Sequence, residues 1–260
     1  MYYILLFLIG LLIGSLINVI VWRMYHDQPF VTGRSKCVHC QHVIAWYDNI
    51  PLLSFILLRA QCRHCKNKIS FYYPCVEFAT GILFLLTGTG IALLQTNVYS
   101  VESLLRHLFF VSVLVVIFVM DLRWYIILDK VIVPAIAVTF LLNWFGNIYT
   151  VKSLLIAMLI GGLFFFIQWF VSRGQWLGSG DIRMGILMGA MLGYPNVIGA
   201  LFVSYMIGGT ISIFFLVFKL KELTSKLPLA TFLSIGTFVY VVFEAYIRTI
   251  TCQLHLFFLC

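Results

Sequence analysis

The chain has 260 residues, of which 62% are hydrophobic and 10% are charged, and its mean hydropathy is +1.05. A soluble domain carries about 25% charged residues and about 45–50% apolar ones, and a water-soluble globule of this size could not bury so much apolar surface. The composition, with a formal charge of +8, therefore excludes a soluble enzyme, a disordered chain and a nucleic-acid-binding protein as descriptions of the whole chain, and it predicts an all-α, polytopic membrane protein.

Apolar segments long enough to cross a bilayer, which takes about 20 residues, recur along the chain. Residues 2–21 carry no charge and lack the basic start and small-residue cleavage site of a secretory signal, so we expect a retained span there. Further spans are predicted at residues 75–94, 104–120, 131–145, 153–171, 184–194, 197–218 and 229–251. The segment 184–194 is too short to cross a bilayer alone. The sequence thus predicts about eight transmembrane helices.

Basic residues gather on one side of this layout. Of the 17 lysines and arginines, 14 fall in residues 22–74, 121–130, 172–183 and 219–228, and the other three are Arg106, Lys152 and Arg248. Because positively charged loops stay in the cytoplasm, the bias predicts that these four loops are cytoplasmic and that both termini lie outside. We expect a first transmembrane helix at 1–21, a cytoplasmic loop domain at 22–74 and a multi-span membrane domain at 75–260.

The loop at 22–74 contains two CxxC pairs, formed by Cys37 with Cys40 and by Cys62 with Cys65. Each pair places two sulfurs on one tight turn, and two such turns can supply the tetrahedral coordination that a structural zinc ion prefers. A redox pair or a disulfide is the alternative, but those suit an oxidising compartment rather than the cytoplasm. We therefore predict a small loop domain held together by a structural Zn²⁺ on four thiolates.

Two aspartates stand out among the few acidic residues, because carboxylates in or beside membrane spans are costly and suggest function. Asp121 closes the uncharged run 108–120, and Asp181 ends the sequence Gly-Ser-Gly-Asp at 178–181, whose glycines let another backbone approach. The predicted topology places both at the cytoplasmic membrane edge. Two neighbouring carboxylates can share a proton and act as general base and general acid, as in aspartic proteases. The structural alternative pairs Asp121 with Arg123 and has Asp181 cap the following helix.

Several short motifs are spread along nearly the whole chain. They are GSLINV at 14–19, RSKCVHC at 34–40, DNIPLLS at 48–54, ISFYYPCVE at 69–77, ILD at 127–129 and GSGDIRM at 178–184. Together they resemble the motifs of the type IV prepilin peptidases, which are membrane aspartic proteases of the GxGD kind. The combination is far more specific than GxGD alone.

The resemblance implies an activity and the residues that perform it. It implies that Asp121 and Asp181 cleave the leader of type IV prepilins and pilin-like proteins at the cytoplasmic face of the bacterial inner membrane. It also implies that Cys37, Cys40, Cys62 and Cys65 hold zinc. Finally, it implies N-methylation of the new N-terminus with S-adenosylmethionine.

The chain departs from the family pattern at four places. Leu128 replaces a proline, Arg183 replaces a common lysine, and a late PFGPFL-like stretch reads PLATFL at 228–233. Before the third cysteine of the loop, Ala60 and Gln61 stand where a glycine and a basic residue are usual. This last departure lies in the part of the family associated with methyl transfer.

Two other functions stay open on the residues alone. A membrane thiol–disulfide oxidoreductase would use the CxxC pairs and bind no zinc, and an ion-coupled transporter would use the intramembrane carboxylates. As partners we expect pilin-like protein substrates and the lipid bilayer, and no nucleic acid. The sequence does not identify the residues that bind S-adenosylmethionine, nor the oligomeric state.

Overall fold

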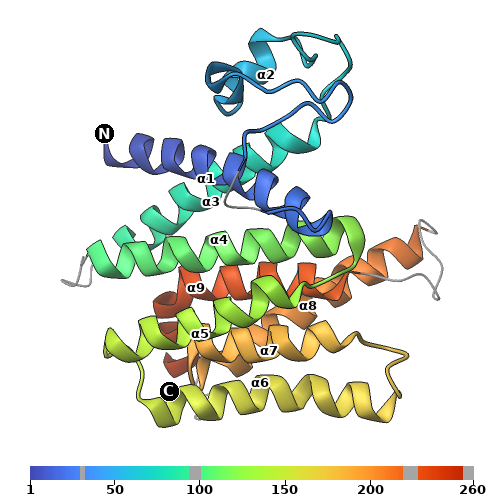
Figure 1. Ribbon diagram of the computed structural model, residues 1–260. Helices are drawn as coiled ribbons and strands as arrows, with labels where there is room; N and C mark the ends of the chain where they lie inside the picture. Colours follow the sequence, from blue (N-terminus) through green and yellow to red (C-terminus); the bar gives the residue numbers. More distant parts are fainter. Residues whose placement is uncertain (30–32, 94–100, 219–227, 254–260) are drawn as a thin grey trace. The chain divides into compact units, whose positions relative to one another are not determined.

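The computed structural model describes residues 1–29, 33–93, 101–218 and 228–253. Within these residues the chain forms nine α-helices, one 3-10 helix and no β-strand (Figure 1). The long helices are α1 (Tyr2–Tyr25), α3 (Tyr72–Leu93), α4 (Val101–Trp124), α5 (Asp129–Phe145), α6 (Val151–Val171), α7 (Ser179–Leu192), α8 (Asn196–Val217) and α9 (Leu229–Gln253). The loop between α1 and α3 carries the short helices η1 (Trp46–Asn49) and α2 (Leu53–Leu57). The predicted all-α class is confirmed.

Each predicted span overlaps one of the eight long helices, although those at 184–194 and 197–218 extend past the ends of α7 and α8 and residue 94 lies outside the described residues. Among the described residues, α1, α4, α6 and α8 are long and apolar enough to cross a membrane, and α9 contains a shorter apolar stretch, Leu229–Phe243. The polytopic membrane class is thereby confirmed, whereas crossing by α3, α5, α7 and α9 stays a prediction. Helices continue beyond the apolar runs, because their backbone hydrogen bonds do not stop at the first charged residue. Asp121 and Asp181 consequently lie within α4 and α7 rather than beside them.

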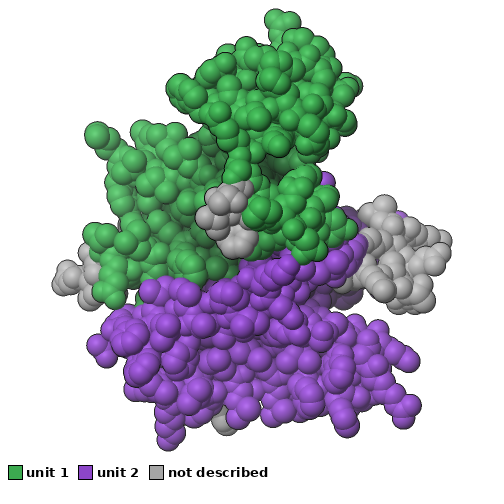
Figure 2. Space-filling model, in the orientation of Figure 1, with its two compact units in different colours: residues 1–116 green, residues 117–260 purple. Residues whose placement is uncertain are grey.

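The chain divides into two compact units, Met1–Val116 and Ile117–Cys260 (Figure 2). In the first unit α1 packs along α3. A Cβ added to Gly10 would lie 2.7 Å from the Cα of Gly81, and one added to Gly14 would lie 2.7 Å from the Cα of Glu77. Glycine is required at these positions, because the two helices contact each other backbone to backbone, as membrane helices with small interface residues do.

In the second unit α7 packs against α5, α6, α8 and α9. Its closest contact is with α6, through Gly185 and Gly189 of α7 and through Ala157 and Gly161 of α6, which in each helix lie four residues apart. A Cβ on Gly161 would overlap the backbone of Gly185, and one on Gly189 would overlap that of Ala157. This stripe of small residues brings the two backbones together. It fixes α7, a helix of only 14 residues that carries Asp181 in its first turn.

Candidate active site and metal centre

The four predicted zinc ligands come together in the first unit. The Sγ atoms of Cys37, Cys40, Cys62 and Cys65 all lie within 4.8 Å of one another, and those of Cys37 and Cys65 are 3.9 Å apart. Four thiolates bound at about 2.3 Å to a tetrahedral zinc ion would lie about 3.8 Å apart. All four cysteines are free thiols. The donor set and its spacing therefore fit a structural zinc ion.

The two CxxC turns share one pattern of backbone hydrogen bonds. In each turn the first cysteine donates its N–H to the carbonyl five residues later, and its own carbonyl accepts from the N–H four residues later. The bonds are Cys37 to His42 at 3.0 Å, Gln41 to Cys37 at 2.9 Å, Cys62 to Asn67 at 2.9 Å and Lys66 to Cys62 at 3.1 Å. Gln41 and Lys66 both have a positive φ, 56° and 58°. The backbone hydrogen bonds within each turn thus fix the positions of its two sulfur atoms.

Charged and polar neighbours support this cluster. The backbone N–H groups of Cys65 and His64 bond to the sulfur of Cys62 and lower the pKa of that thiol to about 7, which favours the thiolate that a metal binds. Arg63 donates from Nε and Nη2 to the two carboxylate oxygens of Asp48, at 2.8 and 2.6 Å. These hydrogen bonds lower the pKa of Asp48. The bidentate pair ties η1 to the second cysteine turn, a role of Arg63 that the sequence did not indicate.

Asp121 lies near the end of α4 and is 6% exposed. Its Oδ2 accepts hydrogen bonds from the backbone N–H and the hydroxyl of Thr231, at 2.7 and 3.0 Å. Thr231 is the third residue of α9, so the carboxylate binds at a helix N-terminus, where unpaired N–H groups and the helix dipole favour an anion. Arg123, the partner in the structural alternative, places its guanidinium over the ring of Trp124.

Asp181 is the third residue of α7 and is 9% exposed. Its Oδ2 accepts a hydrogen bond from the N–H of Gly178 at 3.0 Å, so it caps its own helix as the structural alternative expects. Its carboxylate is also close enough to that of Asp121 for the two charges to interact. The structure therefore places both predicted aspartates in the second unit, within electrostatic range of each other.

The connection between α4 and α5 packs against the first turn of α7. A Cβ on Gly180 would lie 3.1 Å from the Cβ of Ile127, so glycine leaves room for that side chain. Arg183 forms an ion pair with Asp129, which links α7 to the first residue of α5. Leu128, where the family pattern has proline, has φ −80° and ψ 130°. Proline adopts the same conformation, so the departure preserves this turn.

Thr231 is the residue at this site that the sequence reading missed. It lies in the PLATFL stretch at 228–233, at the position of the second proline in the motif that this stretch resembles. Proline has no N–H and no hydroxyl, whereas Thr231 offers both to Asp121. The sequence signal for this role is a threonine at the start of a predicted membrane span. A hydroxyl buried there needs a hydrogen-bond partner.

The fold and the site define a polytopic membrane protein with a buried carboxylate pair and a four-cysteine loop. Residues 8–90 match the bacterial peptidase A24 N-terminal domain, and residues 108–213 match the type IV leader peptidase family. The chain is 35% identical over 215 residues to a prepilin leader peptidase/N-methyltransferase of Myxococcus xanthus (strain DK1622), a match that covers 81% of this chain and 62% of that relative.

Two further relatives carry the same name. The protein of Klebsiella pneumoniae is 32% identical over 199 residues, which cover 73% of this chain and 84% of the relative. The protein of Pectobacterium carotovorum subsp. carotovorum is 26% identical over 257 residues, which cover 88% of each. No solved structure matches the chain. The chain belongs to the type IV leader peptidase family.

Proposed function

We propose that this protein is an aspartic leader peptidase that cleaves prepilins and pilin-like proteins, with Asp121 and Asp181 as its catalytic pair. The observation that carries the proposal is the pair of buried, interacting carboxylates in the second unit, in a chain that belongs to a leader peptidase family. In such a pair one carboxylate takes a proton from water and the other gives a proton to the scissile carbonyl.

The hydrogen bonds assign different tasks to the two oxygens of each carboxylate. The Oδ2 atom is held by a helix N-terminus in both residues, by Thr231 for Asp121 and by Gly178 for Asp181. We assign the contact with water and with the substrate carbonyl to the Oδ1 atoms. Because the Oδ2 contacts fix each side chain, the carboxylates are positioned before the substrate arrives.

The positions of the carboxylates along their helices support the proposed substrate class. Asp121 is three residues from the end of α4, and Asp181 is in the first turn of α7. The resemblance to the prepilin peptidases implies that a pilin-like precursor is cut just before its own hydrophobic helix, which would place the scissile bond at a membrane edge. We propose that the two aspartates meet it there, at the cytoplasmic side of the bacterial inner membrane, with both chain termini outside. The distribution of lysine and arginine supports this orientation.

For the loop domain at 22–74 we propose one structural zinc ion on Cys37, Cys40, Cys62 and Cys65, whose thiolates converge on one point. Bound zinc would supply folding free energy to the loop. The membrane domain at 75–260 would contain the catalytic pair. We also propose N-methylation of the cleaved product with S-adenosylmethionine as the methyl donor; the names of the relatives, which include N-methyltransferase, support the methyl transfer. Among the described residues, we do not assign a binding site for that cofactor to any set of side chains.

The proposal is tested by co-expressing the protein with a prepilin in a bacterium that lacks its own leader peptidase. We expect a mature-size pilin band with the wild-type protein and only precursor with Asp121→Ala or Asp181→Ala. Glu102→Ala, which removes an exposed carboxylate from the first turn of α4, should process normally. Processing by both aspartate variants would overturn the catalytic assignment. Mass spectrometry of the mature N-terminus, with or without an added methyl group, tests the methylation.

A further inference from the structure

The short helices of the cysteine loop expose a group of large apolar side chains. Leu53, Ile56 and Leu57 lie at positions i, i+3 and i+4 of α2 and therefore share one face. Ile56 is 70% exposed, Leu57 is 71% exposed, and Trp46 of the adjacent η1 is 75% exposed. We call Trp46, Leu53, Ile56 and Leu57 the α2 surface. An apolar group of this kind marks an interaction site rather than an ordinary solvated surface.

The α2 surface is tied to the start of a predicted membrane helix. The N–H of Leu52, directly before α2, donates to Oε2 of Glu77 at 3.0 Å, and Glu77 is the sixth residue of α3. Asn18 of α1 in turn donates to the carbonyl of Tyr73 at 3.1 Å. Because Glu77 lies within the predicted span 75–94, the tether places the beginning of α2 at the depth where α3 enters the membrane. The bilayer surface is therefore the partner that we expect the α2 surface to contact.

Positive charge is abundant in the loop that carries the α2 surface. Between residues 33 and 71 the basic side chains are Arg34, Lys36, Arg59, Arg63, Lys66 and Lys68, and the one acidic side chain is Asp48. Asp48 is paired with Arg63, so the remaining charges give the loop a net positive field. Apolar and aromatic side chains bordered by lysine and arginine are typical of segments that lie in the interface of an anionic membrane.

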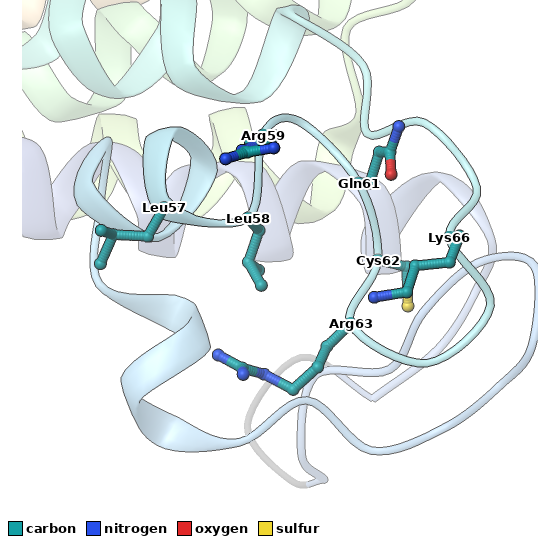
Figure 3. A pocket seen from close by; sticks show the side chains of 7 residues that line it. All are labelled: Leu57, Leu58, Arg59, Gln61, Cys62, Arg63 and Lys66. Atoms are coloured by element: carbon teal, nitrogen blue, oxygen red, sulfur yellow. The ribbon is translucent and has the colours of Figure 1, made fainter.

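An open hollow of about 390 Å³ adjoins α2 (Figure 3). It is lined by Leu57, Leu58, Arg59, Gln61, Cys62, Arg63 and Lys66. Leu58 and Lys66 point into the hollow, and Leu57 belongs both to its lining and to the α2 surface. The hollow therefore combines apolar and cationic groups beside an apolar face, which suits the phosphate and upper acyl region of an anionic lipid.

We propose that the α2 surface lies in the headgroup region of the bilayer and that the adjoining hollow binds the phosphate of an anionic phospholipid through Arg59 and Lys66. The lipid holds the cysteine loop against the membrane edge, while the bond from Leu52 to Glu77 fixes where along α3 the loop attaches. The proposal does not depend on the peptidase activity, since every residue it uses belongs to the first unit.

The test uses the full-length protein in nanodiscs made of phosphatidylcholine alone or mixed with phosphatidylglycerol. Lipids brominated close to the headgroup quench tryptophan fluorescence, and the difference between wild type and Trp46→Phe isolates Trp46 from the other tryptophans. We expect Trp46 to be quenched by the brominated lipid, and more strongly when phosphatidylglycerol is present. Iodide in the aqueous phase should quench it weakly. Metal analysis of each variant shows whether the cysteine loop is intact.

Matched variants separate the apolar contribution from the charge contribution. Ile56→Glu with Leu57→Glu should abolish lipid quenching of Trp46. Arg59→Gln with Lys66→Gln should abolish only the increase in Trp46 quenching that phosphatidylglycerol causes. The control, Lys36→Gln with Lys68→Gln, removes equal charge outside the hollow and should retain that increase. Strong quenching by iodide would show a surface open to water and would overturn the proposal. Protection from both quenchers would also overturn it, because a protein segment would then cover the surface.

Discussion

The cysteine loop and the aspartate pair reach their geometry in opposite ways. Each cysteine turn is closed by backbone hydrogen bonds between residues four and five positions apart. Asp121, in contrast, is held by Thr231, which follows it by 110 residues. The proposed metal centre is thus assembled from two locally determined turns, whereas the geometry of the proposed catalytic pair depends on how α4, α7 and α9 pack. Changes in one region should leave the chemistry of the other largely intact.

The largest expected effect is on catalysis by the aspartates. Asp121→Asn or Asp181→Asn keeps the size of the side chain but removes its acid–base function, and it should lower the rate of prepilin cleavage by about 10²–10⁴-fold. The zinc content should stay unchanged, because the ligands belong to the other unit. Cleavage assays and metal analysis on the same purified samples check both statements. Loss of zinc from these variants would contradict the separation of the two regions.

The second largest effect concerns the metal. Cys62→Ser should lower the zinc content from about one ion per chain to near zero, because three thiolates cannot complete the site. Trypsin should then cut the loop faster at its exposed lysines and arginines. Cys75→Ser, which removes an exposed free cysteine outside the cluster, is the control and should keep its zinc. Prepilin cleavage should fall much less than in the aspartate variants. An equal fall would show that the loop participates directly in the chemistry.

A smaller effect is expected at Thr231, which we regard as a positioning residue. A hydrogen bond to a charged group contributes about 1.5–3 kcal/mol, so Thr231→Val should lower kcat by about 10- to 100-fold with little change in KM. Thr231→Ser keeps the hydroxyl and should restore most of the rate. The control is Thr237→Val, because the hydroxyl of Thr237 bonds to the carbonyl of Leu233 in its own helix. Equal losses in the valine and serine variants would contradict positioning by the hydroxyl.

The smallest effect is expected at the ion pair of the cysteine loop. The folded loop lowers the pKa of Asp48 below its unfolded value of about 3.9. The pair therefore stabilises the loop fully above that pH, and its contribution is lost only as the pH falls further. Asp48→Asn should speed the release of zinc to a chelator by a small factor that is constant between about pH 8 and 9, where histidine side chains such as the nearby His64 are neutral. A factor that changes across this range would contradict the assignment. Arg63→Lys should lose most of the same stabilisation, because lysine lacks the bidentate geometry.

The sequence predicts the parts of this molecule that depend on neighbouring residues. Hydropathy locates the eight long helices, and CxxC spacing identifies which four cysteines meet. The sequence does not predict that Thr231 binds Asp121 or that Leu52 binds Glu77, because those contacts arise from packing between distant segments. The Gly185 and Gly189 stripe is a recognisable small-residue motif, but its partner on α6 becomes identifiable only once the helices are placed.

The central claim is that Asp121 and Asp181 act as one catalytic unit, and a comparison of single and double variants tests it most directly. Turnover of a purified prepilin should be measured for the wild-type protein in nanodiscs, for Asp121→Asn, for Asp181→Asn and for the double variant. Residues that act as a unit lose their contribution together. The double variant should be no slower than the slower single variant. Losses that multiply in the double variant, or turnover in it close to that of the wild-type protein, would contradict a single catalytic unit.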